Sequence, residues 1–162
     1  FGPNTSQTRG LIAVTTQDFL SDIGINVEIE ALEWASFLDA TDAEEPDWDM
    51  FIGGGGGTIQ PHIMYTIWSE ESIPELNSVG YVNKEVEALF EEGGATYDQE
   101  FRKERYQEIQ RIIAEEAPYV FLFYNKSWSG QNNRVKGIVD EPISPLGIGW
   151  NSEDWYIEET SE

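Results

Sequence analysis

Hydrophobic positions in the first quarter of the chain follow two different periods. From about Ser6 to Ile23 they recur every three or four residues, which predicts a helix that ends at Gly24. Residues 25–30 then alternate apolar and charged side chains, which predicts a strand with one buried face. A short apolar stretch at 34–38 favours a second, shorter helix.

A short apolar run at residues 48–52 predicts a buried strand. This run ends in five consecutive glycines, Gly53 to Gly57. Another short helix is expected from Pro61 to Trp68, because proline suits the first position of a helix.

The middle of the chain predicts two further helices. Residues 84–92 place their apolar side chains on one helical face, and Gly93–Gly94 is expected to break that helix. Asp98 is a suitable N-cap for a longer helix at about 99–116, which Pro118 should stop.

The remaining segments decide the predicted fold class. Residues 119–124 are apolar on both faces, which is typical of a strand in the middle of a sheet covered by helices. Only 135–139 suggests a further strand. Strands alternating with helices predict an α/β fold whose sheet is flanked by helices. From residue 126 on, glycine, proline and polar residues dominate, which predicts an irregular C-terminal tail.

Composition narrows the possible partners. The 162 residues include 31 acidic and 9 basic side chains, a formal net charge of −22, which argues against nucleic acid or an anionic membrane as a partner. The scattered acids and the few lysines favour a protein adapted to high salt. The absence of cysteine excludes a disulfide scaffold and a thiol nucleophile. No apolar run approaches the roughly 18 residues of a membrane span, and the chain, which begins at Phe1, is expected to be a piece of a longer protein.

Catalytic and metal-binding patterns are scarce. His62 is the only histidine, and no G-x-S-x-G sequence could present a nucleophilic serine. Acidic clusters such as 42–45 lack the spacing and turn glycine of a calcium loop. We therefore expect no enzyme activity, no cofactor and no metal. Paired carboxylates of a carbohydrate-active enzyme or accessory domain remain the alternative, since the chain has many acids.

The glycine run is the most unusual local feature. It follows a predicted strand, and loops at the carboxyl ends of strands in open α/β sheets commonly face ligands. A phosphate loop is excluded because no Gly-Lys-Ser/Thr follows and no cation lies in residues 58–61. Tryptophans at the ends of elements could add stacking surfaces. The predicted ligand-binding residues are Gly54, Gly55, Gly56, Gly57, Thr58, Gln60, Trp34 and Trp68.

The order of the segments resembles the C-terminal third of a family 5 extracellular solute-binding protein, the dipeptide- and oligopeptide-binding class of ABC transporter receptors. The resemblance covers nearly the whole chain, although each segment by itself is weakly specific. The matching segments are Leu20–Val27, Glu33–Trp34, Trp48–Met50 with the glycine run and Pro61, Tyr81–Leu89, Arg102 with Arg105–Tyr106 and Ile109–Gln110, Ala117–Val120, Val135–Gly137 and Trp155.

This resemblance implies a receptor rather than an enzyme. Family members have two lobes that close on a ligand and present it to ABC permease subunits. The resemblance implies a periplasmic-binding-protein-like lobe with a mixed, mostly parallel sheet. Residues 1–125 would form this ligand-binding lobe, and 126–162 would be a crossover and C-terminal tail that normally contacts the other lobe. The implied partners are thus a small peptide or oligosaccharide, the missing N-terminal lobe and the permease. The implied location is extracellular or periplasmic, with membrane anchoring through the missing N-terminus.

One departure from the family pattern changes the expected ligand. Peptide-binding relatives place Gly-Trp, two residues and Asp before the proline, and the Asp pairs with the peptide's α-amino group. Counting back from Pro61, those Trp and Asp positions fall on Gly54 and Gly57. An unpaired buried ammonium is costly. The sequence therefore favours an uncharged ligand such as an oligosaccharide, or a peptide held in another way. A third interpretation is a salt-adapted interaction domain without a small ligand.

Overall fold

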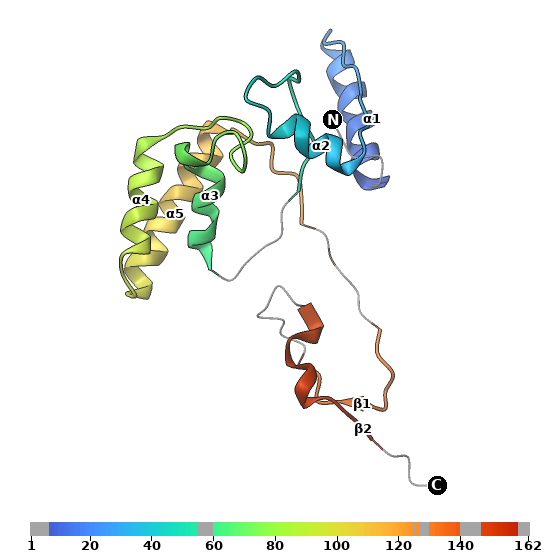
Figure 1. The fold of residues 1–162 in the computed structure, drawn as a ribbon, viewed down its shortest axis with the longest axis vertical. Helices are drawn as coiled ribbons and strands as arrows, with labels where there is room; N and C mark the ends of the chain where they lie inside the picture. The colour runs from blue at the N-terminus through green and yellow to red at the C-terminus, as the bar shows by residue number, and fades with distance from the viewer. Residues whose placement is uncertain (1–6, 55–59, 125, 127–129, 140–146, 159–162) are drawn as a thin grey trace. The chain divides into compact units, whose positions relative to one another are not determined.

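The structure is a computed structural model that describes residues 7–54, 60–124, 126, 130–139 and 147–158 (Figure 1). The chain forms two compact units. One comprises Phe1–Gly55 with His62–Pro118, and the other comprises Gly56–Pro61 with Tyr119–Glu162. The predicted division into 1–125 and 126–162 stays a prediction.

Helix α1, Gln7–Asp22, confirms the first predicted helix. Gly24 follows the end of this helix in the left-handed conformation expected of a glycine there. Its φ is +83°, and its N–H donates to the Ser21 carbonyl oxygen at 3.0 Å. The side chain of Gln17 then donates to the Val27 carbonyl oxygen at 2.7 Å, so that the segment after the helix folds back along it.

Helix α2, Trp34–Thr41, confirms the second predicted helix and is anchored by aromatic rings. Phe37 is 4% exposed and packs edge-on against Phe51, with 6.1 Å between ring centroids. Trp48 packs edge-on against the same Phe51 ring at 5.0 Å, and its Nε1 donates to the Ala40 carbonyl oxygen at 2.9 Å. The chain after α2 is thereby held against the helix.

The short helix expected at Pro61–Trp68 is confirmed as two consecutive pieces. The 3₁₀ helix η1, Pro61–Met64, leads directly into α3, Tyr65–Trp68. A second 3₁₀ turn, η2, follows at Glu70–Ser72.

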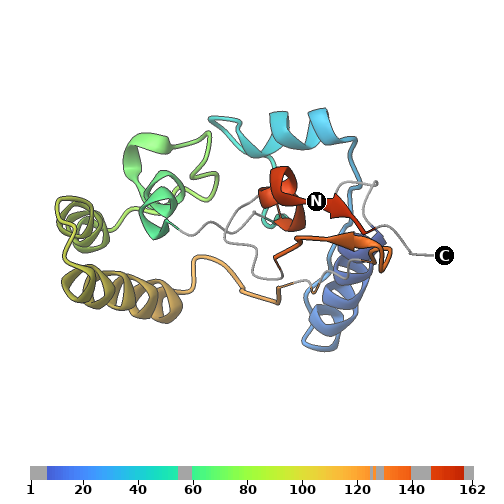
Figure 2. The ribbon, with the colours of Figure 1, turned by 90° about the horizontal axis from the view of Figure 1, so that it is seen from below.

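Helices α4, Lys84–Gly94, and α5, Gln99–Glu116, lie side by side as a hairpin (Figure 2). Asp98 caps α5 as predicted, its carboxylate accepting from the backbone N–H groups of Glu100 and Phe101. Asn83 caps α4 in the same way. The core residues of this region, each at most 7% exposed, are Trp68, Val86, Phe90, Tyr106, Ile109, Ile112 and Ile113. Burying each large apolar side chain stabilises the fold by roughly 1.5–3 kcal/mol.

The prediction that Gly93–Gly94 breaks the helix is wrong, because α4 continues through both residues. Close packing explains the two glycines. A Cβ on Gly93 would lie 3.1 Å from the Tyr106 ring, and one on Gly94 would lie 2.6 Å from the His62 ring. Only a residue without a side chain lets these rings approach the helix so closely.

The predicted strands at 25–30, 48–52 and 119–124 are wrong in this structure: all three segments lack a strand. Residues 120–124 are 56–93% exposed rather than buried. A strand requires a neighbour to pair its backbone N–H and C=O groups, and the apolar pattern reports only which side chains favour burial. The described residues supply no such neighbour to these segments.

The sheet within the described residues consists of two short antiparallel strands, β1, Val135–Lys136, and β2, Tyr156–Ile157. The mixed, mostly parallel sheet is therefore not confirmed. Between the strands lies the 3₁₀ segment η3, Gly147–Asp154. Its Asn151 is 1% exposed, donates to the Gly137 carbonyl oxygen at 2.7 Å and accepts from Trp155 Nε1 at 3.1 Å. This amide links η3 to the strand pair.

Candidate functional site

The structure describes only some of the predicted ligand-binding residues. Gly55, Gly56, Gly57 and Thr58 lie outside the described residues, so their role stays a prediction. Gly54 and Gln60, on either side of them, are exposed.

Trp34 and Gly54 are brought together by a residue that the sequence analysis did not single out, Arg9 on α1. The Arg9 guanidinium lies over the Trp34 ring, with its central carbon 5.6 Å from the ring centroid. A Cβ built on Gly54 would lie 3.3 Å from Nη2 of the same guanidinium. Three segments that are distant in sequence therefore meet at the beginning of the glycine run.

The aromatic cluster of α2 holds Trp34 in place. The Trp34 ring stacks on Phe37, with 5.7 Å between the centroids and 25° between the planes. Phe37 is buried, whereas Trp34 is 48% exposed. The indole is thus held by the buried Phe37 ring while part of it stays exposed to solvent. The exposed part is suited to stacking against a ligand as well as against Arg9.

A charge signal in the sequence could have pointed to Arg9. It is the only lysine or arginine before Lys84 in a chain of net charge −22. The sequence analysis looked for a cation only after the glycine run, whereas the folded chain supplies one from α1.

Trp68 differs from Trp34 in its surroundings. It is 4% exposed, and its ring packs edge-on against Tyr81 with 5.5 Å between centroids. This burial favours a packing role, and a ligand contact at Trp68 stays a prediction.

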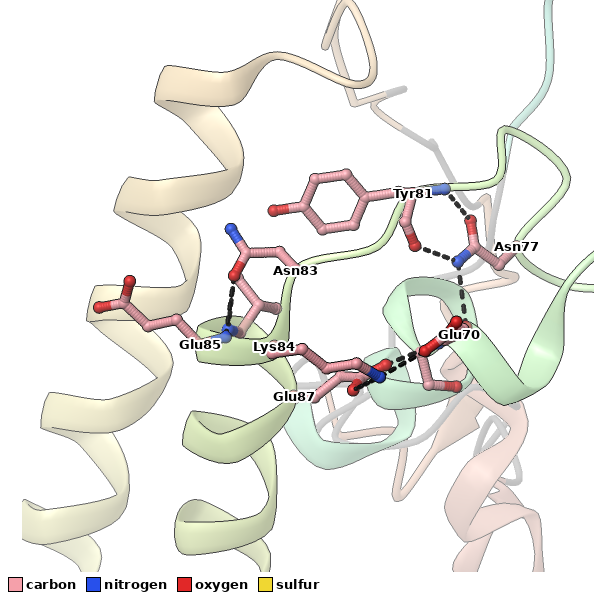
Figure 3. A network of polar contacts seen from close by, with 9 residues as sticks. Glu70, Asn77, Tyr81, Asn83, Lys84, Glu85 and Glu87 are labelled. Atoms are coloured by element: carbon pink, nitrogen blue, oxygen red, sulfur yellow. Dashed lines mark hydrogen bonds and ion pairs between the residues drawn. The ribbon is translucent and has the colours of Figure 1, made fainter.

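A polar network joins η2 to the beginning of α4 in the region of Tyr81 (Figure 3). Lys84 forms ion pairs with Glu70 and, at 2.7 Å, with Glu87. The Glu70 backbone N–H also donates to Glu87 at 2.8 Å. Hydrogen bonds from Lys84 and then from the Glu70 N–H lower the pKa of the Glu87 carboxyl. The charged groups of Lys84, Glu70 and Glu87 all interact with one another, which is typical of a network with a structural role.

The end of α5 contributes a carboxylate to the same region. Glu116 accepts from the Tyr81 hydroxyl at 2.5 Å and from Asn83 Nδ2 at 2.9 Å. These two hydrogen bonds lower the pKa of the Glu116 carboxyl. Burial, followed by the hydrogen bond to Glu116, raises the pKa of Tyr81 to about 12. Tyr81 therefore stays a neutral donor at physiological pH.

His62 packs as an aromatic side chain. Its ring is parallel to that of Tyr65, with 5.8 Å between centroids, and meets Phe90 edge-on at 6.2 Å. Within the described part of the chain, Nδ1 of His62 is buried and makes no hydrogen bond. The same residues contain no group of three or more His, Asp or Glu side chains arranged to hold a metal ion.

Helices of the described segments are all too short or too polar to cross a membrane. No family model matches the chain.

The chain is similar to curated and solved peptide-binding proteins. It is 28% identical to the oligopeptide-binding protein AppA of Bacillus subtilis over 94% of its own length and 27% of that protein's. It is 34% identical to the probable D,D-dipeptide-binding periplasmic protein DdpA of Escherichia coli over 82% of its own length and 26% of that protein's. A putative peptide-binding protein AppA from Clostridium difficile superposes with a TM-score of 0.82 at 26% identity, over 96% of this chain and 32% of the other.

The matched proteins are all peptide-binding proteins, and each match covers most of this chain but only a fraction of the other protein. The chain spans about a quarter of the length of the curated relatives, while most of the chain itself is matched. The resemblance indicated by the sequence is therefore confirmed: the chain is a relative of the oligopeptide- and dipeptide-binding class of family 5 extracellular solute-binding proteins and corresponds to a portion of such a protein.

Proposed function

We propose that this chain is part of the substrate-capturing receptor of an ABC importer and that it binds a peptide-like ligand without chemical conversion. The observation that carries the proposal is the similarity to peptide-binding proteins over 82–96% of the chain. The ABC transporter-associated periplasmic binding protein DppA from Helicobacter pylori, solved in complex with the peptide STSA, adds to it, with a TM-score of 0.66 and 30% identity. It covers 92% of this chain and 29% of the other.

The geometry at the beginning of the glycine run supports ligand contact there. Trp34 presents a half-exposed ring on a buried aromatic base, and Gly54 adjoins it through the Arg9 guanidinium. An exposed aromatic ring beside a backbone without side chains suits an extended ligand that stacks and forms backbone hydrogen bonds. The relatives are named for binding oligopeptides or dipeptides, or were solved with a peptide, which favours a peptide over an oligosaccharide here.

The wider setting belongs to the same proposal. A second lobe would close over the ligand, and permease subunits would receive it. The protein would act outside the cytoplasmic membrane, anchored to it and adapted to high salt. Support comes from the periplasmic relative and, for the salt adaptation, from the net charge of −22.

The test is a thermal-shift screen of a full-length receptor that contains these residues, in about molar potassium chloride. The panel holds di- to pentapeptides beside cello-, malto- and xylo-oligosaccharides. A ligand that binds only the native state stabilises it and so raises the melting temperature. At a free ligand concentration of one hundred times the Kd, the stabilisation is about 2.7 kcal/mol. We expect shifts with peptides.

Two variants test whether the ligand binds at Trp34. Trp34→Ala should reduce the ligand-induced shift, measured from its own melting temperature without ligand. Tyr97→Ala is the control, because the Tyr97 side chain is fully exposed in the turn between α4 and α5. Shifts with sugars alone would contradict the peptide ligand, and no shift with any compound would contradict the receptor function.

A further inference from the structure

Residues 120–124 expose five consecutive large apolar side chains. The exposed fractions are 84% for Val120, 61% for Phe121, 56% for Leu122, 59% for Phe123 and 93% for Tyr124. Single exposed apolar residues are common on protein surfaces and need no explanation. Contiguous exposed apolar surface, in contrast, marks a place where another part or partner packs.

The rings of Tyr119 and Phe121 indicate how the side chains of this segment alternate. Their centroids lie 6.2 Å apart, although the two residues are not neighbours in sequence. Residues two apart in an extended chain lie on the same side, so that Leu122 lies on the other. Both the odd and the even positions of 119–124 are apolar. A partner on one side alone would therefore leave an apolar face in water.

The backbone of the same segment is open as well. Within the described part of the chain, no backbone hydrogen bond joins residues 120–124 to another segment. Backbone N–H and C=O groups that become buried need hydrogen-bond partners. A partner that covers these side chains must therefore also supply backbone groups, as extended segments do when they lie along a free edge.

Charge and length limit what can cover this segment. A second copy of the chain carries the same net charge of −22 and is repelled, and an anionic membrane surface is repelled for the same reason. The chain spans about a quarter of the length of its curated relatives, so most of such a receptor lies outside these residues. That part is joined covalently to the segment and is large enough to cover both of its faces.

We propose that residues 120–124 are the surface on which the part of the receptor outside these 162 residues docks. Extended segments of that part lie along the backbone of 120–124, and its apolar side chains cover both faces. The exposure of the segment in this structure follows from the absence of that neighbour among the described residues. The inference goes beyond the proposed function, because it depends on the family relationship and not on which ligand is bound.

The first experiment measures amide hydrogen exchange by mass spectrometry in a full-length receptor that contains these residues. We expect the amides of 120–124 to exchange about a thousandfold more slowly than in the urea-unfolded receptor, because they become part of a cooperatively folded core. Exchange at the rate of the unfolded chain would overturn the proposal. Protection that increases with protein concentration would overturn it too, since a second copy would then be the partner.

Two substitutions test the two faces separately. Phe121→Asp and Leu122→Asp each place a carboxylate on a different face of the segment. Each should lower the melting temperature of the full-length receptor by several degrees, because burial of an unpaired charge is costly. Tyr97→Asp is the matched control and should leave the melting temperature unchanged, since the Tyr97 ring is fully exposed in the turn between α4 and α5.

The combination of results decides the outcome. A lower melting temperature in only one of the two aspartate variants would show that the other face stays in water, which contradicts docking on both faces. If a variant does not fold, Phe121→Ala and Leu122→Ala replace the aspartates, and the exchange of the unchanged receptor remains decisive. A receptor with protected 120–124 amides that binds no peptide would contradict the proposed function and support this inference.

Discussion

The buried side-chain amide of Asn77 hydrogen-bonds both backbone polar groups of Tyr81. Its Nδ2 donates to the Tyr81 carbonyl oxygen at 2.7 Å, and its Oδ1 accepts from the Tyr81 N–H at 3.0 Å. The same Nδ2 donates to the Ser69 carbonyl oxygen at 3.0 Å (Figure 3). Asn77 is fully buried, so a single side chain satisfies three backbone groups in addition to the backbone hydrogen bonds of the loop itself.

Asn77→Ala should destabilise the protein by about 1–3 kcal/mol, because three backbone groups near it lose their partner. Asn77→Asp should also destabilise it, since a carboxylate retains the acceptor but loses both contacts of the donor and buries a charge. Urea unfolding followed by circular dichroism measures both free energies. Ser78→Ala, in the same loop but only partly buried, is the control; an equal loss there would contradict the specific role of Asn77.

Two helical glycines should respond in opposite ways to alanine. Gly10→Ala in α1 should raise the free energy of unfolding by about 0.5–1 kcal/mol, because alanine favours the helix and nothing lies within 4 Å of its new Cβ. Gly94→Ala in α4 should lower it, since its Cβ would lie 2.6 Å from the His62 ring.

The measurement is the same urea titration on both variants, with near-ultraviolet circular dichroism to follow the aromatic rings. Gly94→Ala should change that aromatic signal, whereas Gly10→Ala should not. Equal stabilisation by both substitutions would show that His62 moves away without cost and that its packing against α4 contributes nothing.

Tyr81 should make stability fall at alkaline pH. Burial and the hydrogen bond to Glu116 raise its pKa from 10.0 to about 12 in the folded protein. The neutral hydroxyl is therefore favoured in the folded state, and this contribution is complete below about pH 10. It is lost as the pH rises from 10 to 12, because the unfolded chain ionises first.

Chemical unfolding at a series of pH values from 8 to 12 measures this decline, and absorbance at 295 nm follows phenolate formation. Tyr81→Phe should show a smaller decline over the same interval. Tyr97→Phe, with a fully exposed ring, should keep the decline of the unchanged protein. If Tyr81→Phe declined as steeply, another group would be responsible.

The helices were predictable because their signals are local. Asp98 and the apolar stripe of residues 99–116 predicted α5 with its observed bounds, and the glycine at 24 predicted the end of α1. Capping and periodicity act within one or two turns, so they are readable without knowledge of the fold. Gly93–Gly94 misled because the contact that favours glycine there comes from rings elsewhere in the chain.

The strands were not predictable in the same way. Residues 25–30 and 119–124 have the apolar patterns of sheet strands, but pairing depends on neighbours that no local pattern specifies. The chain spans about a quarter of the length of its curated relatives. Within the described residues, these apolar segments have no adjacent strand, and many of their side chains are exposed.

The candidate site also had one part that the sequence predicted and one part that only the structure revealed. The sequence by itself determined that an aromatic residue and a glycine run were available for ligand contact, because residue type is sufficient for that inference. Only the tertiary structure decided that Trp34 is half-exposed while Trp68 is buried, and that Arg9 lies at both Trp34 and Gly54. Exposure and charge at a site depend on which distant segments meet, and that is a property of packing rather than of local sequence.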